Sequence, residues 1–339
     1  MKRALILLLI CLLLGLPALA EEAASKQITP QPAKYTGALY FGVEVYERMD
    51  FESPRLGFIA RDRTVEILQV EPAWLKVRYK ELEGYIKRQA MLDSSIRNLD
   101  PQANPTYGTV PNAWLAWVKE EAPILAAPQA DAKALVTMRE GARLALIDIE
   151  DGWGRLIYHR QYGYINTNHL SEIQPINFSG DAGYDAPMAA YTSFYRLTTD
   201  QSNLNRIVNL EVAGERFKLY TLNTGDRLDF NQQIGPYSRR NGYLPANALV
   251  KGETVQSYGG GTCQVSSTLF NAVLQLPQIA VLKRRPHGPS AAAYLPHGAD
   301  AAVGSVAQNF IIQNQFAFPI RIDSTVQDGA LTIAIYRCD

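Results

Sequence analysis

The sequence predicts a multidomain protein in which two small all-β units precede a larger α+β domain. A β-rich segment occurs twice along the chain, and the C-terminal part combines predicted helices with predicted strands. Length alone, 339 residues at roughly 150 per domain, suggests about two domains. The repeat divides the N-terminal part further, so we expect three units.

The composition excludes several classes of protein. The 33 basic and 33 acidic residues cancel, so a nucleic-acid partner has no electrostatic support. An apolar fraction of 47% excludes a disordered chain. Three cysteines exclude a disulfide-dense scaffold.

The first residues have the pattern of a secretory signal peptide, predicted as 1–20. Lys2 and Arg3 precede the apolar run 4–14, and small residues then lead to a cleavage site after Ala20. The run is shorter than the roughly 20 apolar residues that cross a membrane. An uncleaved anchor is the alternative. Lipidation of Cys11 is disfavoured because Ile10 precedes it.

Cleavage would leave Cys263 and Cys338 as the only cysteines, and no later segment without charges is long enough to cross a membrane. We therefore expect a secreted product, in the periplasm or the cell wall, with no integral membrane segment. A disulfide is permitted in that compartment.

A linker is predicted at 21–35, which is polar and contains prolines, and the repeat follows it. Trp153 follows Trp74 by 79 residues, and Gly-Tyr-Ile at 163–165 follows Gly-Tyr-Ile at 84–86 by the same interval. Each repeat contains short β-rich runs separated by turn residues. A β unit of this size must close into a small barrel to bury one core.

The repeat resembles the bacterial SH3-like domain, over residues 36–95 and 112–172. This resemblance implies modules that bind cell-wall peptides or serve as spacers. Four aromatic residues are expected in the barrel cores, with a ligand-facing position as the alternative. They are Trp74, Tyr85, Trp153 and Tyr164.

A second linker is predicted at 173–188, and the α+β domain at 189–339. Ser202 and Asn203 can cap a helix that Gly214 ends. Closing strands are predicted at 310–312, 318–322 and 331–335, with Asp328-Gly329 as a hairpin turn.

The sharpest motif is the run 259–272, in which three consecutive glycines precede a helical pattern. Cys263 is therefore expected at a helix N-terminus, where unpaired N–H groups and the helix dipole favour a thiolate. The same N–H groups could hold an oxyanion. Candidate substrate-binding or oxyanion residues here are Gly260, Gly261, Gln264 and Ser266, although helix capping would also explain Ser266.

Residues 202–337 resemble the VanW family. The shared motifs are Gly-Pro at 235–236, Gly-Tyr at 242–243, the run 259–272, Arg-Pro-His at 285–287, Tyr-Leu-Pro at 294–296 and Asp-Ala-Ala-Val at 300–303. Some members of the family are understood as cysteine-dependent L,D-transpeptidases that cross-link peptidoglycan stems. The resemblance implies Cys263 as nucleophile, with His287 and Asp300 in the other shared motifs.

A cysteine acyltransferase needs a base, and His titrates near the working pH. We take His287 as the base, Asp300 as the residue that orients it, and His297 as the second choice. Arg285 is a candidate partner for a substrate carboxylate, with a solvated face as the alternative. No cofactor and no metal are expected, since Cys263, His287, His297 and Asp300 lack the short spacing typical of zinc ligands.

Two functions therefore remain open for a protein whose expected partner is the peptidoglycan stem peptide. The first is a peptidoglycan acyltransferase that forms a thioester on Cys263. The second is a non-catalytic wall-binding or scaffold protein, in which Cys263 could form a disulfide with Cys338.

Overall fold

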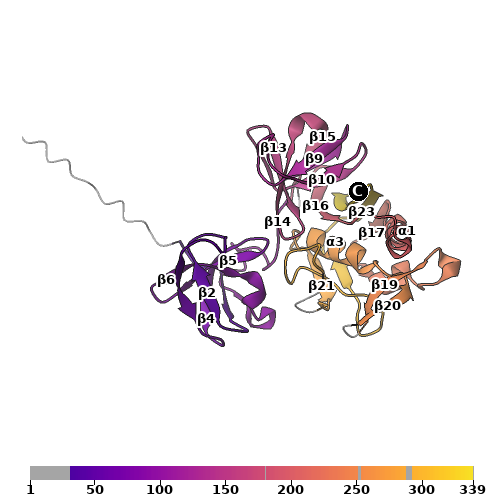
Figure 1. The fold of residues 1–339 in the computed structure, drawn as a ribbon. Helices are drawn as coiled ribbons and strands as arrows, with labels where there is room; N and C mark the ends of the chain where they lie inside the picture. Colours follow the sequence, from indigo (N-terminus) through magenta and orange to yellow (C-terminus); the bar gives the residue numbers. More distant parts are fainter. Residues whose placement is uncertain (1–30, 180, 251–252, 288–291, 339) are drawn as a thin grey trace, which may run out of the picture. The chain divides into compact units, whose positions relative to one another are not determined.

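The computed structural model describes residues 31–179, 181–250, 253–287 and 292–338 (Figure 1). The predicted signal peptide and most of the first linker lie outside these residues. Among the helices described, none is both long and apolar enough to cross a membrane. The chain is rich in β-structure, as the sequence predicted, with antiparallel sheets throughout and three α-helices in the described residues.

A seven-stranded antiparallel sheet forms from the first part of the chain, in the order β3-β2-β6-β5-β4-β1-β7. Its strands are β1 (Tyr35–Ala38), β2 (Val43–Tyr46), β3 (Arg55–Ile59), β4 (Thr64–Val70), β5 (Trp74–Tyr79), β6 (Leu82–Lys87) and β7 (Arg97–Asn98). Short helices η1 (Arg88–Ala90) and η2 (Asp93–Ser95) precede β7. Val45, Ile67 and Leu75 are fully buried in a core of their own. Because β3 and β7 are both edges, the hydrogen-bonding pattern does not form a closed barrel.

Two sheets form from the next part of the chain, in the orders β10-β9-β14-β13-β12 and β11-β8-β15. The strands are β8 (Trp114–Val118), β9 (Ala122–Leu125), β10 (Ala134–Met138), β11 (Arg143–Leu146), β12 (Asp148–Glu150), β13 (Trp153–Tyr158), β14 (Gln161–Asn166) and β15 (Leu170–Pro175), with η3 (Thr167–His169) before β15. Ile124, Leu144 and Ile165 are buried between them.

The sequence repeat is also a structural repeat. In the β5–β6 hairpin, Trp74 pairs with Lys87 and Tyr79 with Leu82. In the β13–β14 hairpin, Trp153 pairs with Asn166 and Tyr158 with Gln161, which is the same register 79 residues later.

The aromatic residues of the repeat do not share one environment. Trp74 is buried, whereas Tyr85, Trp153 and Tyr164 are only half-buried. Successive side chains of a strand point to opposite faces, and the glycine and isoleucine on either side of each tyrosine face inward. Each tyrosine therefore faces away from the core. Trp153 and Tyr164 instead line a hollow of about 260 Å³, which corrects the expectation that they fill a core.

The C-terminal part combines a four-stranded sheet in the order β16-β24-β23-β17, a three-stranded sheet in the order β18-β22-β21, and the β19–β20 hairpin. The strands are β16 (Pro187–Phe194), β17 (Tyr220–Leu222), β18 (Arg227–Asp229), β19 (Pro245–Val250), β20 (Glu253–Tyr258), β21 (Ile279–Lys283), β22 (Ile311–Asn314), β23 (Ile320–Gln327) and β24 (Ala330–Arg337). The helices are α1 (Gln201–Glu215), α2 (Phe230–Ile234) and α3 (Cys263–Val273), with η4 (Arg239–Asn241).

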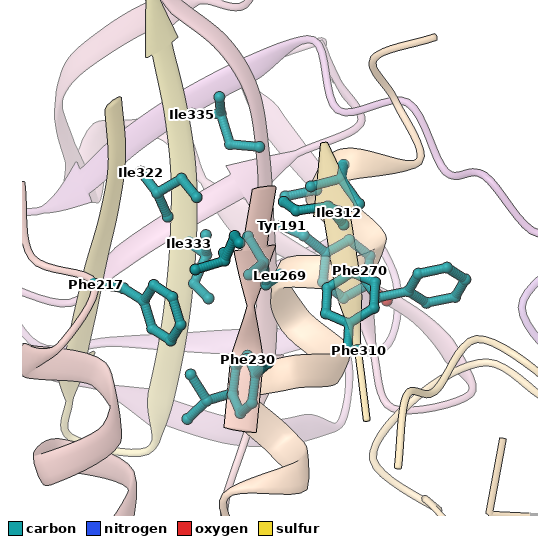
Figure 2. Packing of buried hydrophobic residues seen from close by; sticks show 14 of the residues in the cluster. Tyr191, Phe217, Phe230, Leu269, Phe270, Phe310, Ile312, Ile322, Ile333 and Ile335 are labelled. Atoms are coloured by element: carbon teal, nitrogen blue, oxygen red, sulfur yellow. The ribbon is translucent and has the colours of Figure 1, made fainter. Parts of the chain in front are cut away.

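Helix α3 packs against β16 and β24, and its apolar side chains fill the largest core. Leu269 of α3 and Ile333 of β24 both belong to this core, in which the rings of Phe217 and Phe230 stack (Figure 2). Because residues 264–273 are all buried, α3 is enclosed along its length. Only its first residue, Cys263, retains partial exposure, so the core fixes the direction in which the thiol is presented.

The predictions made from local sequence patterns in the C-terminal part are largely correct. The predicted hairpin turn forms with positive φ at both Asp328 and Gly329, as a two-residue turn requires. The cap of α1 differs from the prediction: the Asp200 carboxylate accepts a hydrogen bond from the Asn203 N–H over 2.9 Å. A carboxylate three residues before an N–H is a strong N-cap, and it outcompetes Ser202.

Candidate functional site

Cys263 opens onto a cavity of about 660 Å³. The cavity lies between the β19–β20 hairpin, the glycine run and the loop after β21, which supply lining residues such as Thr254, Gly261 and His287. The glycines are required by close packing. A Cβ at Gly260 would lie 2.5 Å from the Ala246 carbonyl oxygen.

The thiol itself faces the loop before β22. The Val303 N–H donates a hydrogen bond to Cys263 Sγ over 3.5 Å, and Sγ lies 3.6 Å from the Val303 carbonyl oxygen. Cys263 is not in a disulfide. The alternative of a bridge to Cys338 is therefore wrong for this structure, because α3 carries the sulfur toward the cavity instead.

His287 joins Cys263 to Asp300. Its Nδ1 lies 2.5 Å from Asp300 Oδ2, and it lines the same cavity as Cys263, whose side chain contributes to the raised pKa of the imidazole. Burial lowers the pKa of His287, but the interactions with Asp300 and Cys263 outweigh burial and raise it to about 10. Burial likewise raises the pKa of Asp300, whereas the hydrogen bonds from His287 bring it below its usual range. The imidazole is thus held as a cation beside the sulfur.

Arg284 contacts Asp300 through an ion pair and a hydrogen bond. Its Nη2 lies 3.7 Å from Asp300 Oδ1, and its Nε donates to the Asp300 carbonyl oxygen over 2.7 Å. The guanidinium also covers the Phe270 ring, with its central carbon 4.8 Å from the ring centroid. Arg285, the arginine singled out from the sequence, has an exposed side chain that is not among the described residues lining the cavity. The neighbouring Arg284, rather than Arg285, therefore contacts Asp300 in the segment that follows β21.

His297 does not meet the thiol. It is buried and lines a different cavity, together with His159 and Arg160. Its predicted role as second-choice base is therefore not supported. Among the described residues, no group of three or more His, Cys, Asp or Glu side chains has an arrangement that could hold a metal ion.

The oxyanion candidates divide into two groups. The N–H groups of Gly260 and Gln264 are occupied, because they donate to the carbonyl oxygens of Ser257 and Gly261 over 3.2 and 2.8 Å. Within the described part of the chain, the N–H groups of Gly261 and Cys263 have no hydrogen-bond acceptor. These two are the donors available to a ligand oxygen beside Sγ.

The side chains of Gln264 and Ser266 point into the protein rather than into the cavity. Gln264 Nε2 donates to Ser193 Oγ over 3.0 Å, and Ser266 Oγ donates to the Ala301 carbonyl oxygen over 2.6 Å. They tie α3 to β16 and to the loop that follows Asp300. Their predicted substrate contact is corrected to a structural role, because the α3 N-terminus points these positions inward.

Among the lining residues that the sequence analysis did not predict for the site are Arg206, Tyr237 and Tyr294. Burial, together with the charge of Cys263, raises the pKa of both tyrosines. Arg206 lies on α1 one turn before Asn209, which is fully buried. Because Ser202 and Asn203, one turn before Arg206, are also polar, the sequence pattern of α1 did not single out Arg206.

Comparison with known proteins agrees with the sequence resemblance. Residues 205–336 match the family model described as "VanW like protein". The "Uncharacterized protein YoaR" of Bacillus subtilis (strain 168) is 36% identical over 183 residues. That match covers 52% of this chain and 60% of the relative, so the chain spans less than two thirds of the relative's length.

Solved structures give only a faint likeness. NlpC2 of Trichomonas vaginalis is 14% identical with a TM-score of 0.16, over 57% of this chain and 58% of that chain. An NlpC/P60 family protein from Bacillus cereus ATCC 10987 is 10% identical with a TM-score of 0.16, over 88% of this chain and 93% of that chain. Scores this low carry no argument. The family match does, and residues 205–336, which include Cys263, His287 and Asp300, are a VanW family domain.

Proposed function

We propose that this protein is an exported, cell-wall-associated cysteine acyltransferase of the L,D-transpeptidase type that acts on peptidoglycan stem peptides. One observation carries the proposal: Cys263, His287 and Asp300, distant in sequence, come together at one cavity, where His287 is hydrogen-bonded to Asp300 and interacts electrostatically with Cys263. A nucleophile, a base and a residue that orients the base are the parts that acyl transfer needs.

The array supports a balanced reaction. The Cys263 thiolate attacks the carbonyl carbon of a peptide bond, and the N–H groups of Gly261 and Cys263 stabilise the oxyanion. The His287 imidazolium then donates its proton to the departing amine as the C–N bond breaks. A thioester remains on Sγ, and the neutral imidazole accepts a proton from the amine of a neighbouring stem as that amine forms the new amide and releases the thiolate.

Asp300 has a positioning role in this scheme. Its bond to His287 Nδ1 leaves Nε2 as the ring nitrogen that serves the thiol. The carboxylate also stabilises the imidazolium, in agreement with the raised pKa of His287.

The N-terminal β units would bring the site to its substrate. We propose that residues 36–95 and 112–172 are SH3-like modules that hold the protein on the wall, where tethering raises the local concentration of stem peptides. The repeated hairpin register supports a common origin of the two units. Export by the predicted signal peptide would place the protein in the periplasm or the cell wall.

Incubation with disaccharide-tetrapeptide muropeptides, read by mass spectrometry, tests the proposal. Cross-linked dimers are expected from residues 21–339, together with a trapped acyl adduct on Cys263. The Cys263→Ser variant should give neither, while Cys338→Ser, the matched control, should act like the parent. Wall binding without any product in the parent protein would instead favour a non-catalytic scaffold.

A further inference from the structure

The cavity beside Cys263 has an unbalanced charge. Its positively charged lining side chains are Arg206 and His287, and no aspartate or glutamate is among the described residues that line it. With the pKa of His287 raised, both carry positive charge at neutral pH. The Cys263 thiolate pairs with the His287 imidazolium, so the charge of Arg206 has no counter-charge among the described residues that line the cavity. The cavity is therefore complementary to an anionic group.

Arg206 is held rigidly at this wall. Its Nη2 donates to Gln264 Oε1 over 2.7 Å, and the Gln264 amide is fixed in turn by Ser193 Oγ and the Phe194 carbonyl oxygen. The arginine also lies against the glycine run. A Cβ at Gly261 would be 2.7 Å from Arg206 Cγ and 2.9 Å from Nη1, so glycine at 261 admits the guanidinium.

The guanidinium lacks a carboxylate partner within the part of the chain that the structure describes. Its one hydrogen bond goes to the neutral Gln264 amide, and none of the ion pairs found there involves it. A guanidinium presents five N–H donors in a planar fork that matches a carboxylate. Arg206 is half-buried, and most of its N–H donors make no hydrogen bond to the described residues. They are therefore available to a ligand anion.

We propose that Arg206 binds the free α-carboxylate of the substrate residue just beyond the bond that Cys263 attacks. The proposal rests on the acyl-transfer function, and it defines the substrate class as peptides cleaved at their last residue. Arg206 touches Gly261, whose N–H group is one of the two oxyanion donors. In a C-terminal residue the carboxylate is separated from the attacked carbonyl only by N and Cα, so neighbouring protein groups can bind both.

The thiol itself can report this selectivity without any turnover. Iodoacetate and iodoacetamide both alkylate accessible thiolates, and only iodoacetate carries a carboxylate. We expect the ratio of the iodoacetate rate to the iodoacetamide rate to fall about tenfold in Arg206→Gln. Arg206→Lys should fall between the two, since it retains the charge but loses the fork. Arg285→Gln, an exposed arginine near His287 in sequence, is the matched control and should leave the ratio unchanged.

Protection of Cys263 from alkylation can be measured in the parent protein. The result then does not depend on how the variants fold. N-acetyl-D-alanine should slow alkylation of Cys263 by iodoacetamide, whereas N-acetyl-D-alaninamide should not. Equal protection by both compounds, or an unchanged alkylation ratio in a folded Arg206→Gln protein, would overturn the proposal.

The two proposals fail in different ways. Arg206-dependent selectivity in a protein that forms no muropeptide product would leave the carboxylate site standing and remove the acyltransferase function. Equal turnover of stem tetrapeptides that end in a free carboxylate or in an amide would retain the function and overturn the role of Arg206.

Discussion

Asp300 accepts two hydrogen bonds from His287 through a single oxygen. Oδ2 lies 2.7 Å from the His287 backbone nitrogen and 2.5 Å from Nδ1. The carboxylate therefore fixes both the backbone and the ring of the same residue. This double contact sets the direction in which the imidazole meets the Cys263 thiol.

Asp300→Asn is expected to lower the rate of acyl transfer by about 100-fold while the protein remains folded. The amide can still accept from the His287 backbone, but it no longer stabilises an imidazolium or selects the tautomer. The measurement is cross-linked product per unit time, with Asp131→Asn at an exposed turn as control. Full activity in Asp300→Asn would contradict the array.

The raised pKa of His287 makes stability depend on pH. A pKa of about 10 in the folded protein, against roughly 6.5 in the unfolded chain, means that the folded state holds the proton more tightly. The resulting stabilisation is complete below about pH 6.5 and is lost as the pH rises toward 10. The difference in melting temperature between the parent and His287→Gln should therefore narrow across this window.

In Cys263→Ser the upper end of the same window should move to lower pH, because the Cys263 side chain supplies part of the shift at His287. Melting curves recorded at intervals between pH 6 and pH 10 test both statements. A constant difference between parent and His287→Gln would show that the histidine is not protonated preferentially in the folded state.

Gly260→Ala should destabilise the protein by about 1–3 kcal/mol. The new methyl would meet the carbonyl oxygens of Ala246 and Asn247 at 2.5 and 2.9 Å, and backbone cannot move aside as a flexible side chain can. The β19 strand would be pushed from the glycine run, so the alkylation rate of Cys263 should change as well. Gly183→Ala is the control, since a Cβ there meets nothing within 4 Å.

Leu269→Ala should cost about 2–5 kcal/mol of unfolding free energy. Leu269 is fully buried where α3 meets the four-stranded sheet, and its loss leaves a cavity that the strands cannot close (Figure 2). Leu204→Ala on α1, where the side chain is 42% exposed, should cost far less. Denaturant unfolding of both variants measures the contrast, and equal losses would count against the packing of α3.

The amino-acid sequence alone was sufficient for features set by neighbouring residues. The 79-residue repeat predicted two similar β units, which the structure shows as hairpins with a shared register, and Asp328-Gly329 predicted a turn that forms. The glycine run followed by a helical pattern predicted that Cys263 begins a helix. Each of these depends on local backbone preference, which a short window of sequence contains.

Only the tertiary structure decided which side chains meet. Arg284 rather than Arg285 supports Asp300, His297 lines another cavity, and Arg206 reaches the thiol site from a helix more than 50 residues away in sequence. Hydrophobic periodicity predicts that a helix has a buried face. Which residues that face contacts depends on packing across the whole domain. The residues of this site lie on separate elements, and the core positions those elements. The sequence therefore indicates which residues are in the site, but it does not indicate which of them contact one another.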